Sequence, residues 1–371
     1  MRPGAVAKAF DFKAQPAAVL LQGARQWWVV QTSGKRVSVS VFKNVIVYRI
    51  EPAWSQTLAE AEEGLAKQRF VPCGPSQEKS AGWVEPRGEA NGPLVESIDG
   101  QWLVEYMIES KQVPGSVVRR KLDERCASIE ATTGRKPGKK EKKDLKEDIT
   151  LELLPMAFTR SARVTVWIDK AENRLVINSG NATRADEVVT SLVKSLDGFA
   201  VALVNTQIEP AAAMANWLLT QEPPAGFSID RECELKASDD SKAVVRYAKH
   251  ALDIDEVKQH ITDGKRPTRL ALTWDDRVSF ELTQGMLIRK ITFLEGTGDG
   301  ASGGKKEDNF DADVAIATGE LGQLVPALLD ALGGEAAFSA ALPDDTAKPA
   351  AKAPTTTTPA DAPEEEEDAP F

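Results

Sequence analysis

Cysteine and histidine are scarce in this chain of 371 residues. The three cysteines, Cys73, Cys126 and Cys233, are odd in number and far apart, so they predict no disulfide framework. The two histidines, His250 and His260, belong to no Cys-x-x-Cys or His-x-x-x-His motif, so the sequence gives almost no support for a zinc site. We therefore expect no metal site and no cofactor.

Long apolar runs are also missing. No uncharged apolar segment approaches the ~20 residues that a helix needs to cross a bilayer. The N-terminus lacks the basic start, apolar stretch and small-residue cleavage site of a secretory signal. With 42% hydrophobic and 27% charged residues, the composition is that of a soluble globular protein. These features predict a cytoplasmic protein without a membrane partner.

The chain as a whole has no excess of positive charge: 46 Lys and Arg minus 56 Asp and Glu is −10. The two signs are nevertheless separated along the sequence. Residues 341–371 contain two lysines and eight acidic residues (2 − 8 = −6), whereas residues 111–146 contain twelve basic and five acidic residues (12 − 5 = +7). Because the local field decides what a surface attracts, the net charge does not exclude a nucleic-acid partner.

Hydrophobic periodicity predicts an α+β fold. Pro114 opens a predicted helix that ends before the Gly134–Gly138 break, and a basic helix follows until Pro155. The predicted strands cover 42–50, 101–108, 163–168, 174–178, parts of 227–250, 268–274, 277–283, 286–294 and 310–317. The predicted helices cover 55–68, 114–133, 139–154, 253–263, 319–332 and a segment capped by Asn181 or Thr183.

These elements divide the chain into predicted parts. Residues 1–40 form an N-terminal extension that is either disordered or the product of a mis-set start, with Val41 as the true first residue. The other parts are an α+β body (41–113 and 156–210), a projecting helical basic arm (114–155), a second α+β region with a meander and a C-terminal helix (211–336), and a disordered acidic tail (337–371).

Two motifs that would indicate an enzyme are weak. Residues 298–303 match G-x-G-x-x-G, but a dinucleotide site needs a helix directly behind the glycines, and residues 295–309 are predicted to form a loop. Five carboxylates could hold Mg²⁺ for phosphodiester hydrolysis: Asp275, Asp276, Asp308, Asp311 and Asp313. Acidic residues at a loop edge are more often solvated, so a metal-dependent nuclease is only an alternative and we expect no catalytic residue.

The basic segment is the most informative feature. On the helix after Gly138, basic residues recur every three or four positions and share one face, and an apolar stripe for packing occupies another. The basic face comprises Lys139, Lys142, Lys143 and Lys146, and the stripe comprises Leu145, Ile149 and Leu153. Either the basic face is simply solvated, or it binds phosphates and releases their counterions.

Short motifs from residue 42 to residue 336 resemble those of the RdgC family of bacterial recombination-associated proteins. They include Phe42-Lys43-Asn44, Val47-Tyr48-Arg49, Phe70-Val71-Pro72-Cys73-Gly74, Gly82-Trp83-Val84, Leu153-Leu154-Pro155-Met156-Ala157-Phe158-Thr159-Arg160, Trp167-Ile168-Asp169, Leu270-Ala271-Leu272-Thr273-Trp274, Thr318-Gly319-Glu320-Leu321 and Gly333-Gly334-Glu335. The resemblance is collinear, and residues 1–40 and the acidic tail lie outside it.

The resemblance implies a ring-shaped homodimer that encircles duplex DNA without catalysis and with little sequence preference. It implies a nucleoid-associated role in limiting RecA-dependent recombination, with RecA and single-stranded DNA as further candidate partners. Such a protein should contact the DNA backbone and show strong salt dependence.

The resemblance also implies functional residues. It relates Arg135, Phe158 and Lys249 to DNA contact or ring closure, and we assign Phe158 to the ring interface, although an aromatic residue after Leu-Leu-Pro often packs in a core. Together with the basic segment, the predicted DNA-binding residues are Arg135, Lys136, Lys139, Lys140, Lys142, Lys146, Arg246 and Lys249. His250 would make the charge beside Lys249 depend on pH.

The C-terminus ends in Glu364-Glu365-Glu366-Glu367-Asp368-Ala369-Pro370-Phe371. This end resembles the acidic tip of bacterial single-stranded-DNA-binding proteins, which docks on repair enzymes. Two hypotheses remain open beside that of a merely solubilising tail. Asp368, Pro370 and Phe371 could recruit repair proteins, which would make the chain an adaptor, or the tail could fold back on the basic surface and compete with DNA.

Overall fold

The computed structural model describes residues 41–294 and 306–336, and the side chains of residues 310–336 within the second range. These residues form twelve β-strands in two antiparallel sheets, seven α-helices and one short 3₁₀ helix. The predicted α+β fold is therefore confirmed. The N-terminal extension, residues 295–305 and the acidic tail lie outside the described residues.

The larger sheet contains seven strands, all paired antiparallel. Its order is β2-β4-β5-β6-β1-β7, and β3 pairs with β4 beside β2. The strands are β1 (Ile46–Ile50), β2 (Lys79–Val84), β3 (Val95–Ile98), β4 (Gln101–Gln112), β5 (Phe158–Asp169), β6 (Arg174–Ile177) and β7 (Val201–Leu203). β4 and β5 are the longest and stay paired from Trp102↔Ile168 to Gln112↔Phe158.

The smaller sheet has the order β12-β11-β10-β8-β9. Its strands are β8 (Phe227–Ala237), β9 (Val244–Ala248), β10 (Lys265–Trp274), β11 (Val278–Thr283) and β12 (Ile288–Phe293). The last three strands are sequential neighbours, which confirms the predicted meander. An isolated bridge between Val45 and Ile288 joins this sheet to the start of β1.

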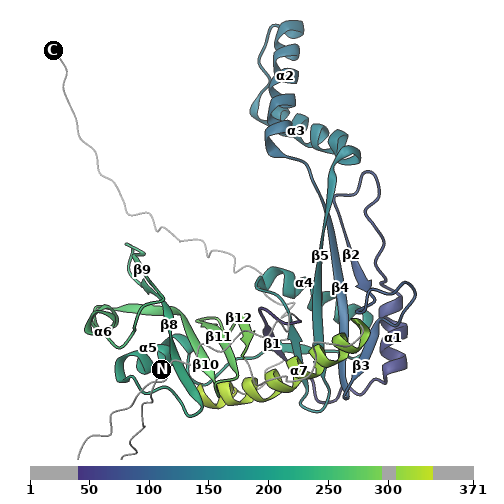
Figure 1. The fold of residues 1–371 in the computed structure, drawn as a ribbon. Coiled ribbons are helices and arrows are strands. Elements are labelled where there is room, and N and C mark those ends of the chain that lie inside the picture. The colour runs from purple at the N-terminus through teal and green to yellow at the C-terminus, as the bar shows by residue number, and fades with distance from the viewer. Residues whose placement is uncertain (1–40, 295–305, 337–371) are drawn as a thin grey trace, which may run out of the picture. The chain divides into compact units, whose positions relative to one another are not determined.

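The helices are α1 (Leu58–Ala66), α2 (Gly115–Thr133), α3 (Lys139–Leu153), α4 (Ala182–Ser195), α5 (Pro210–Thr220), α6 (Asp255–Thr262) and α7 (Lys306–Ala331). Side chains of α1 and α4 share one buried cluster with one face of the larger sheet. Side chains of α5, α6 and α7 share a second cluster with the smaller sheet and the opposite face of the larger one. The 3₁₀ helix Leu154–Met156 and then β5 follow α3, so α2 and α3 are inserted between β4 and β5 and lie at their far ends (Figure 1).

Local sequence explains where the covering helices begin and how closely they pack. Asn181 caps α4, because its side chain accepts a hydrogen bond from the Arg184 amide at 3.3 Å, so Thr183 is not the cap. Gly64 lets α1 approach the end of α4, since a Cβ there would lie 2.2 Å from the Ser195 carbonyl oxygen.

The predicted strand over 310–317 is wrong, because these residues belong to α7. The segment Phe310-Asp311-Ala312-Asp313-Val314 alternates like a strand, but the buried residues recur at helical spacing: Val314, Ala317, Leu321, Leu324 and Leu328. Burial of this stripe against both sheets favours the helix. α7 also begins earlier than predicted, at Lys306, so the predicted loop over 295–309 is wrong for residues 306–309.

One window of α7, Phe310–Ala331, is long and apolar enough to span a membrane by length and composition alone. Half of that window is buried inside the protein. Its apolar stripe lies in the core cluster shared by the two sheets. We therefore interpret α7 as a core helix.

Several elements were not predicted from the sequence. β2 and β3 lie in the stretch that is rich in Gly and Pro, and β7 and α5 also lacked a clear pattern. Leu58 and Leu65 lie seven residues apart on α1, but only Leu65 is buried and Leu58 is 36% exposed. Ala61 and Gly64 complete the buried face of α1.

Candidate nucleic-acid interface

The helical hairpin formed by α2 and α3 carries most of the predicted DNA-binding residues. Pro114 precedes α2, which ends at Gly134 in the left-handed conformation, with φ of 71°. α3 begins after Gly138, whose amide donates to the Glu141 carboxylate at 3.4 Å. The hairpin has a small core of its own, in which Val118 of α2 packs with Ile149 and Leu153 of α3.

At the base of the hairpin, charged side chains of α2 and α3 pair with one another. Glu152 of α3 accepts hydrogen bonds from Lys121 at 3.1 Å and from Arg125 at 2.7 Å, both on α2. The hydrogen bond and positive charge of Lys121, with the charge of Arg125, lower the pKa of Glu152. These ion pairs connect α2 with α3, and their cations already have an acidic partner.

Basic residues farther from this base are exposed, and only some have an acidic partner. Arg135 lies 3.0 Å from Glu141, and Lys136 lies 3.7 Å from Glu130. Four lysines form no ion pair with any described residue: Lys139, Lys140, Lys142 and Lys146. We call these four the α3 lysines. Lys143, on the same helix, lies 3.8 Å from Glu147.

A pocket of about 450 Å³ adjoins the α3 lysines. Lys143, Lys146, Glu147, Thr150 and Leu151 of α3 line it, and Glu78 from the loop before β2 closes it. Lys111 holds this loop in place by donating to the carbonyl oxygens of Gly74 and Pro75 at 2.7 and 2.8 Å. Sequence reasoning missed the pocket because Glu78 is far from α3 along the chain.

Arg246 and Lys249 belong to a different part of the structure. Arg246 lies on β9, where its Nε atom donates to the Glu234 carboxylate at 2.6 Å. Lys249 follows the end of that strand in the left-handed conformation and is exposed. The Nδ1 atom of His250 lies 2.7 Å from the Ala251 carbonyl oxygen. Figure 1 shows β9 far from α3, so the described chain does not bring the two predicted groups together.

Phe158 is the first residue of β5 and is 89% exposed. The alternative that it packs in the core is therefore wrong. Met156 and Leu151, which precede it, are 70% and 52% exposed. An aromatic ring held in solvent at the base of the hairpin is a feature of protein interfaces. Asp368, Pro370 and Phe371, predicted for partner docking, lie outside the described residues.

The structure separates most of the carboxylates considered for metal binding. Asp275 and Asp276 occupy the turn between β10 and β11, whereas Asp311 on α7 pairs with Arg87 at 2.6 Å. Burial raises the pKa of Asp313. Among the side chains of residues 41–294 and 310–336, no three Asp, Glu, His or Cys residues are grouped closely enough to hold a metal ion. The Asp308 side chain lies outside the described residues.

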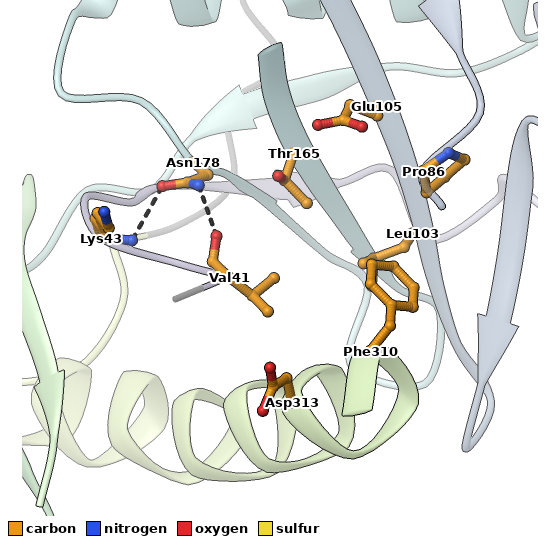
Figure 2. Close-up of a pocket in the computed structure, with 9 residues that line it drawn as sticks. All are labelled: Val41, Lys43, Pro86, Leu103, Glu105, Thr165, Asn178, Phe310 and Asp313. Atoms are coloured by element: carbon orange, nitrogen blue, oxygen red, sulfur yellow. Dashed lines mark hydrogen bonds between the residues drawn. The ribbon is translucent and has the colours of Figure 1, made fainter. Parts of the chain in front are cut away.

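Asp313 lines a second pocket, of about 420 Å³, between the larger sheet and α7 (Figure 2). The Asn178 side chain closes one side by donating to the Val41 carbonyl oxygen at 2.7 Å and accepting from the Lys43 amide at 3.1 Å. Glu105 lies opposite, where burial raises its pKa although Arg163 lies 3.0 Å away. This pocket combines residues from six chain segments, and no sequence motif indicated it.

Comparison with known proteins agrees with the motifs. A family model described as "Putative exonuclease, RdgC" matches residues 41–335. A relative from Dechloromonas aromatica is 43% identical over 299 residues, which are 79% of this chain and 98% of the relative. A relative from Herminiimonas arsenicoxydans is 40% identical over 298 residues, covering 80% and 99%, and one from Bordetella pertussis is 40% identical over 296 residues, covering 79% and 98%. All three are named "Recombination-associated protein RdgC".

The match covers most of the chain, at about 40% identity and over nearly the whole length of each relative. The resemblance inferred from the sequence is thus confirmed. The chain belongs to the RdgC family of recombination-associated proteins.

Proposed function

We propose that the chain binds duplex DNA through its sugar–phosphate backbone, without sequence preference, and thereby modulates RecA-dependent recombination. The observation that carries this proposal is the group of four α3 lysines, which are exposed and without an acidic partner among the described residues. Membership of a recombination-associated family supports the role, which would be exercised in the cytoplasm at the nucleoid.

Lysine suits this kind of binding. Its ammonium group is a compact charge on a flexible stem, which can follow a phosphate without fixing a base sequence. Arg135 and Lys136 lie beside the α3 lysines and extend the basic surface, although each already has an acidic partner. A DNA phosphate can replace these exposed carboxylates, because exposed ion pairs contribute little stability.

The proposed assembly is a ring-shaped homodimer with Phe158 at one interface. Exposure of 89% for an aromatic side chain supports a surface role for this residue. In such a ring both copies would present their α3 lysines to DNA, and Arg246 and Lys249 would add contacts from the smaller sheet.

Salt dependence tests the DNA interface directly. Duplex binding is measured by fluorescence anisotropy at several salt concentrations for the wild type and a Lys139→Ala/Lys142→Ala/Lys146→Ala variant. The affinity should fall with a slope of about −0.9 per phosphate contact, so each contact contributes about 8-fold at 0.1 M salt. Loss of three contacts should weaken binding by up to about 500-fold there and flatten the slope by about 2.7, or twice that if both copies bind.

A matched control removes three exposed lysines from other elements: Lys67, Lys194 and Lys236. The control and the α3 variant lose the same net charge, because each loses three lysines. None of the control lysines forms an ion pair with a described residue. The control should keep the wild-type slope. An equal loss in both variants would mean that only total charge matters, and an unchanged slope in the α3 variant would remove α3 from the interface.

Oligomeric state tests the ring interface. Phe158→Glu should leave the thermal midpoint unchanged, because the side chain is already in solvent, and should shift the dimer to monomer in sedimentation at nanomolar concentration. A dimer as stable as the wild type would exclude Phe158 from the interface. Loss of inhibition by the α3 variant in a RecA strand-exchange assay would connect DNA binding to recombination.

The description of the family model includes exonuclease activity, so cleavage needs its own assay. Linear and plasmid DNA are incubated with the protein and Mg²⁺ or Mn²⁺. We expect the DNA to remain intact. If nucleotides are released, and this activity co-purifies with the protein, the nuclease alternative would replace the binding proposal.

A further inference from the structure

The segment around the α3 lysines is strongly positive, whereas the rest of the described chain is acidic. Residues 134–146 contain seven basic residues and two acidic ones (7 − 2 = +5). The described residues outside the hairpin of residues 115–153 contain 26 basic and 37 acidic residues (26 − 37 = −11). A strongly acidic segment of the same chain, Glu364-Glu365-Glu366-Glu367-Asp368, carries the complementary charge.

We propose that the α3 lysines and the pocket beside them bind the chain's own C-terminal end, residues 364–371, when DNA is absent. The contact itself follows from the charges and the surface of α3. Its consequence, competition with DNA, rests on the proposed function.

The dimensions of the two partners agree. Lys139 and Lys146 are seven residues apart on a helix, or about 10 Å. The five acidic residues from Glu364 to Asp368 span about 13 Å when extended, so the run can follow the lysines along the helix axis. Three residues further, Phe371 would lie about 10 Å beyond Asp368, in the direction of Leu151, which follows Lys146 by about 7.5 Å.

The pocket can accept the terminal aromatic ring but not the acidic run. Leu151 is 52% exposed and gives the pocket an apolar surface. Glu78 and Glu147 also line the pocket and would repel further carboxylates. The geometry therefore assigns the acidic run to the α3 lysines and the Phe371 side chain to the pocket, with Lys143 or Lys146 near the terminal carboxylate.

The covalent connection is long enough. The described chain ends at Ala336, whose amide donates to the Asn205 carbonyl oxygen at 2.9 Å, beside β7. From there, β5 runs about 40 Å to the hairpin, and α3 adds about 22 Å. The 28 residues from Ala336 to Glu364 can span up to about 90 Å.

Weak binding is enough for an intrachain contact. A tethered segment acts at an effective concentration of about 1 mM. If the free peptide binds with Kd of about 0.1 mM, the α3 lysines are covered about ten times as often as they are free. The apparent affinity for DNA is then lowered by about 11-fold.

Cross-linking tests the contact without DNA. A zero-length carbodiimide reagent joins carboxylates to lysines in the full chain at low salt, and the linked peptides are identified by mass spectrometry. We expect links from Glu364–Asp368 to Lys139–Lys146. Mixed isotope labels should show that both peptides come from one chain. Links mainly to Lys8, Lys13 or Lys35, or only between differently labelled chains, would overturn the proposal.

DNA binding tests the consequence. Replacing residues 364–367 by Gln and Asp368 by Asn should tighten duplex binding by about 10-fold at 50 mM salt, with the difference vanishing near 0.5 M. Phe371→Ala should give a smaller gain, and Asp344→Asn/Asp345→Asn is the control that should give none. Equal DNA affinity in all variants, with the cross-links absent, overturns this inference but leaves the proposed function. Absence of DNA binding in every variant overturns the proposed function, and the cross-links still decide the contact.

Discussion

The hairpin that carries the α3 lysines depends on very few buried side chains. Val118, Ile149 and Leu153 form its core, and this cluster is separate from the two clusters of the body. Three half-buried residues, Val113, Val117 and Leu122, pack around it. The stability of the hairpin is therefore local, and a single substitution should open the arm without unfolding the sheets.

Ile149→Ala is the sharpest perturbation, because Ile149 is fully buried. The substitution removes three carbons at about 0.8 kcal/mol each and leaves a cavity, for a total of about 2–4 kcal/mol. Complete burial of three such side chains contributes only about 5–9 kcal/mol before the entropy of ordering is subtracted. The expected loss is thus a large part of what holds α2 against α3.

Hydrogen exchange measures this loss directly. A change of 2–4 kcal/mol should reduce amide protection in α2 and α3 by about 30- to 1,000-fold, whereas β10 and β11 should keep their protection. Leu151→Ala is the matched control on the same helix, and its half-exposed side chain should cost less than about 0.5 kcal/mol. An equal loss of protection in β10 and β11, or an unchanged hairpin, would refute the idea of an independent arm.

Three further substitutions test the body. Gly64→Ala should lower stability by about 1–3 kcal/mol in chemical denaturation, because its Cβ would clash with the Ser195 carbonyl oxygen, and a wild-type midpoint would refute that close approach. Burial raises the pKa of Asp230, so its charged form destabilises the fold above that pKa. Asp230→Asn should therefore raise the melting temperature more at pH 8 than at pH 4.5. A larger increase at pH 4.5 than at pH 8 would contradict this explanation. Arg277→Ala removes the partner of buried Glu320, whose pKa is raised by burial, and should cost about 1–3 kcal/mol at pH 8 but less at pH 5, where the carboxyl can take up a proton; a loss independent of pH would refute this account.

The hairpin could be predicted because its boundaries are local. Pro114 fixes the first turn of α2, and Gly134 supplies the left-handed end that most other residues avoid. The spacing of the lysines then places them on one exposed face. What spacing could not reveal is which cations already have partners. Arg135 is paired with Glu141 while Lys139 is not, and that difference depends on how the chain turns between the two helices.

The misassigned strand shows where periodicity fails. The alternation from Phe310 to Val314 covers only five residues, and alanine fits either pattern. The helical spacing becomes clear only when Leu321, Leu324 and Leu328 are included, and the choice depends on the two sheets against which α7 packs. Packing against the sheets, and not the local pattern, therefore determines that residues 310–317 are helical.

The outer ends of β4 and β5, residues 109–112 and 158–162, were missed for another reason. Near the hairpin both strands are polar on both faces, as in Glu109-Ser110-Lys111 opposite Thr159-Arg160-Ser161. A strand pattern needs one buried face, and here the pairing continues beyond the helices that cover the sheet. Backbone pairing between β4 and β5, and not side-chain burial, extends the two strands to the arm.

This extension supports the proposed binding of DNA by a protein with an acidic body. The β4–β5 pairing from Trp102 to Gln112 covers about 33 Å, which is about three Debye lengths at 0.1 M salt. At that distance the negative charge of the body is largely screened from a duplex that lies against the α3 lysines. Acidic residues close to the lysines act within one Debye length, whether on α3 itself or in the C-terminal end. It follows that charge changes on the body, away from Arg246 and Lys249, should affect DNA affinity far less than equal changes on the arm or at residues 364–368.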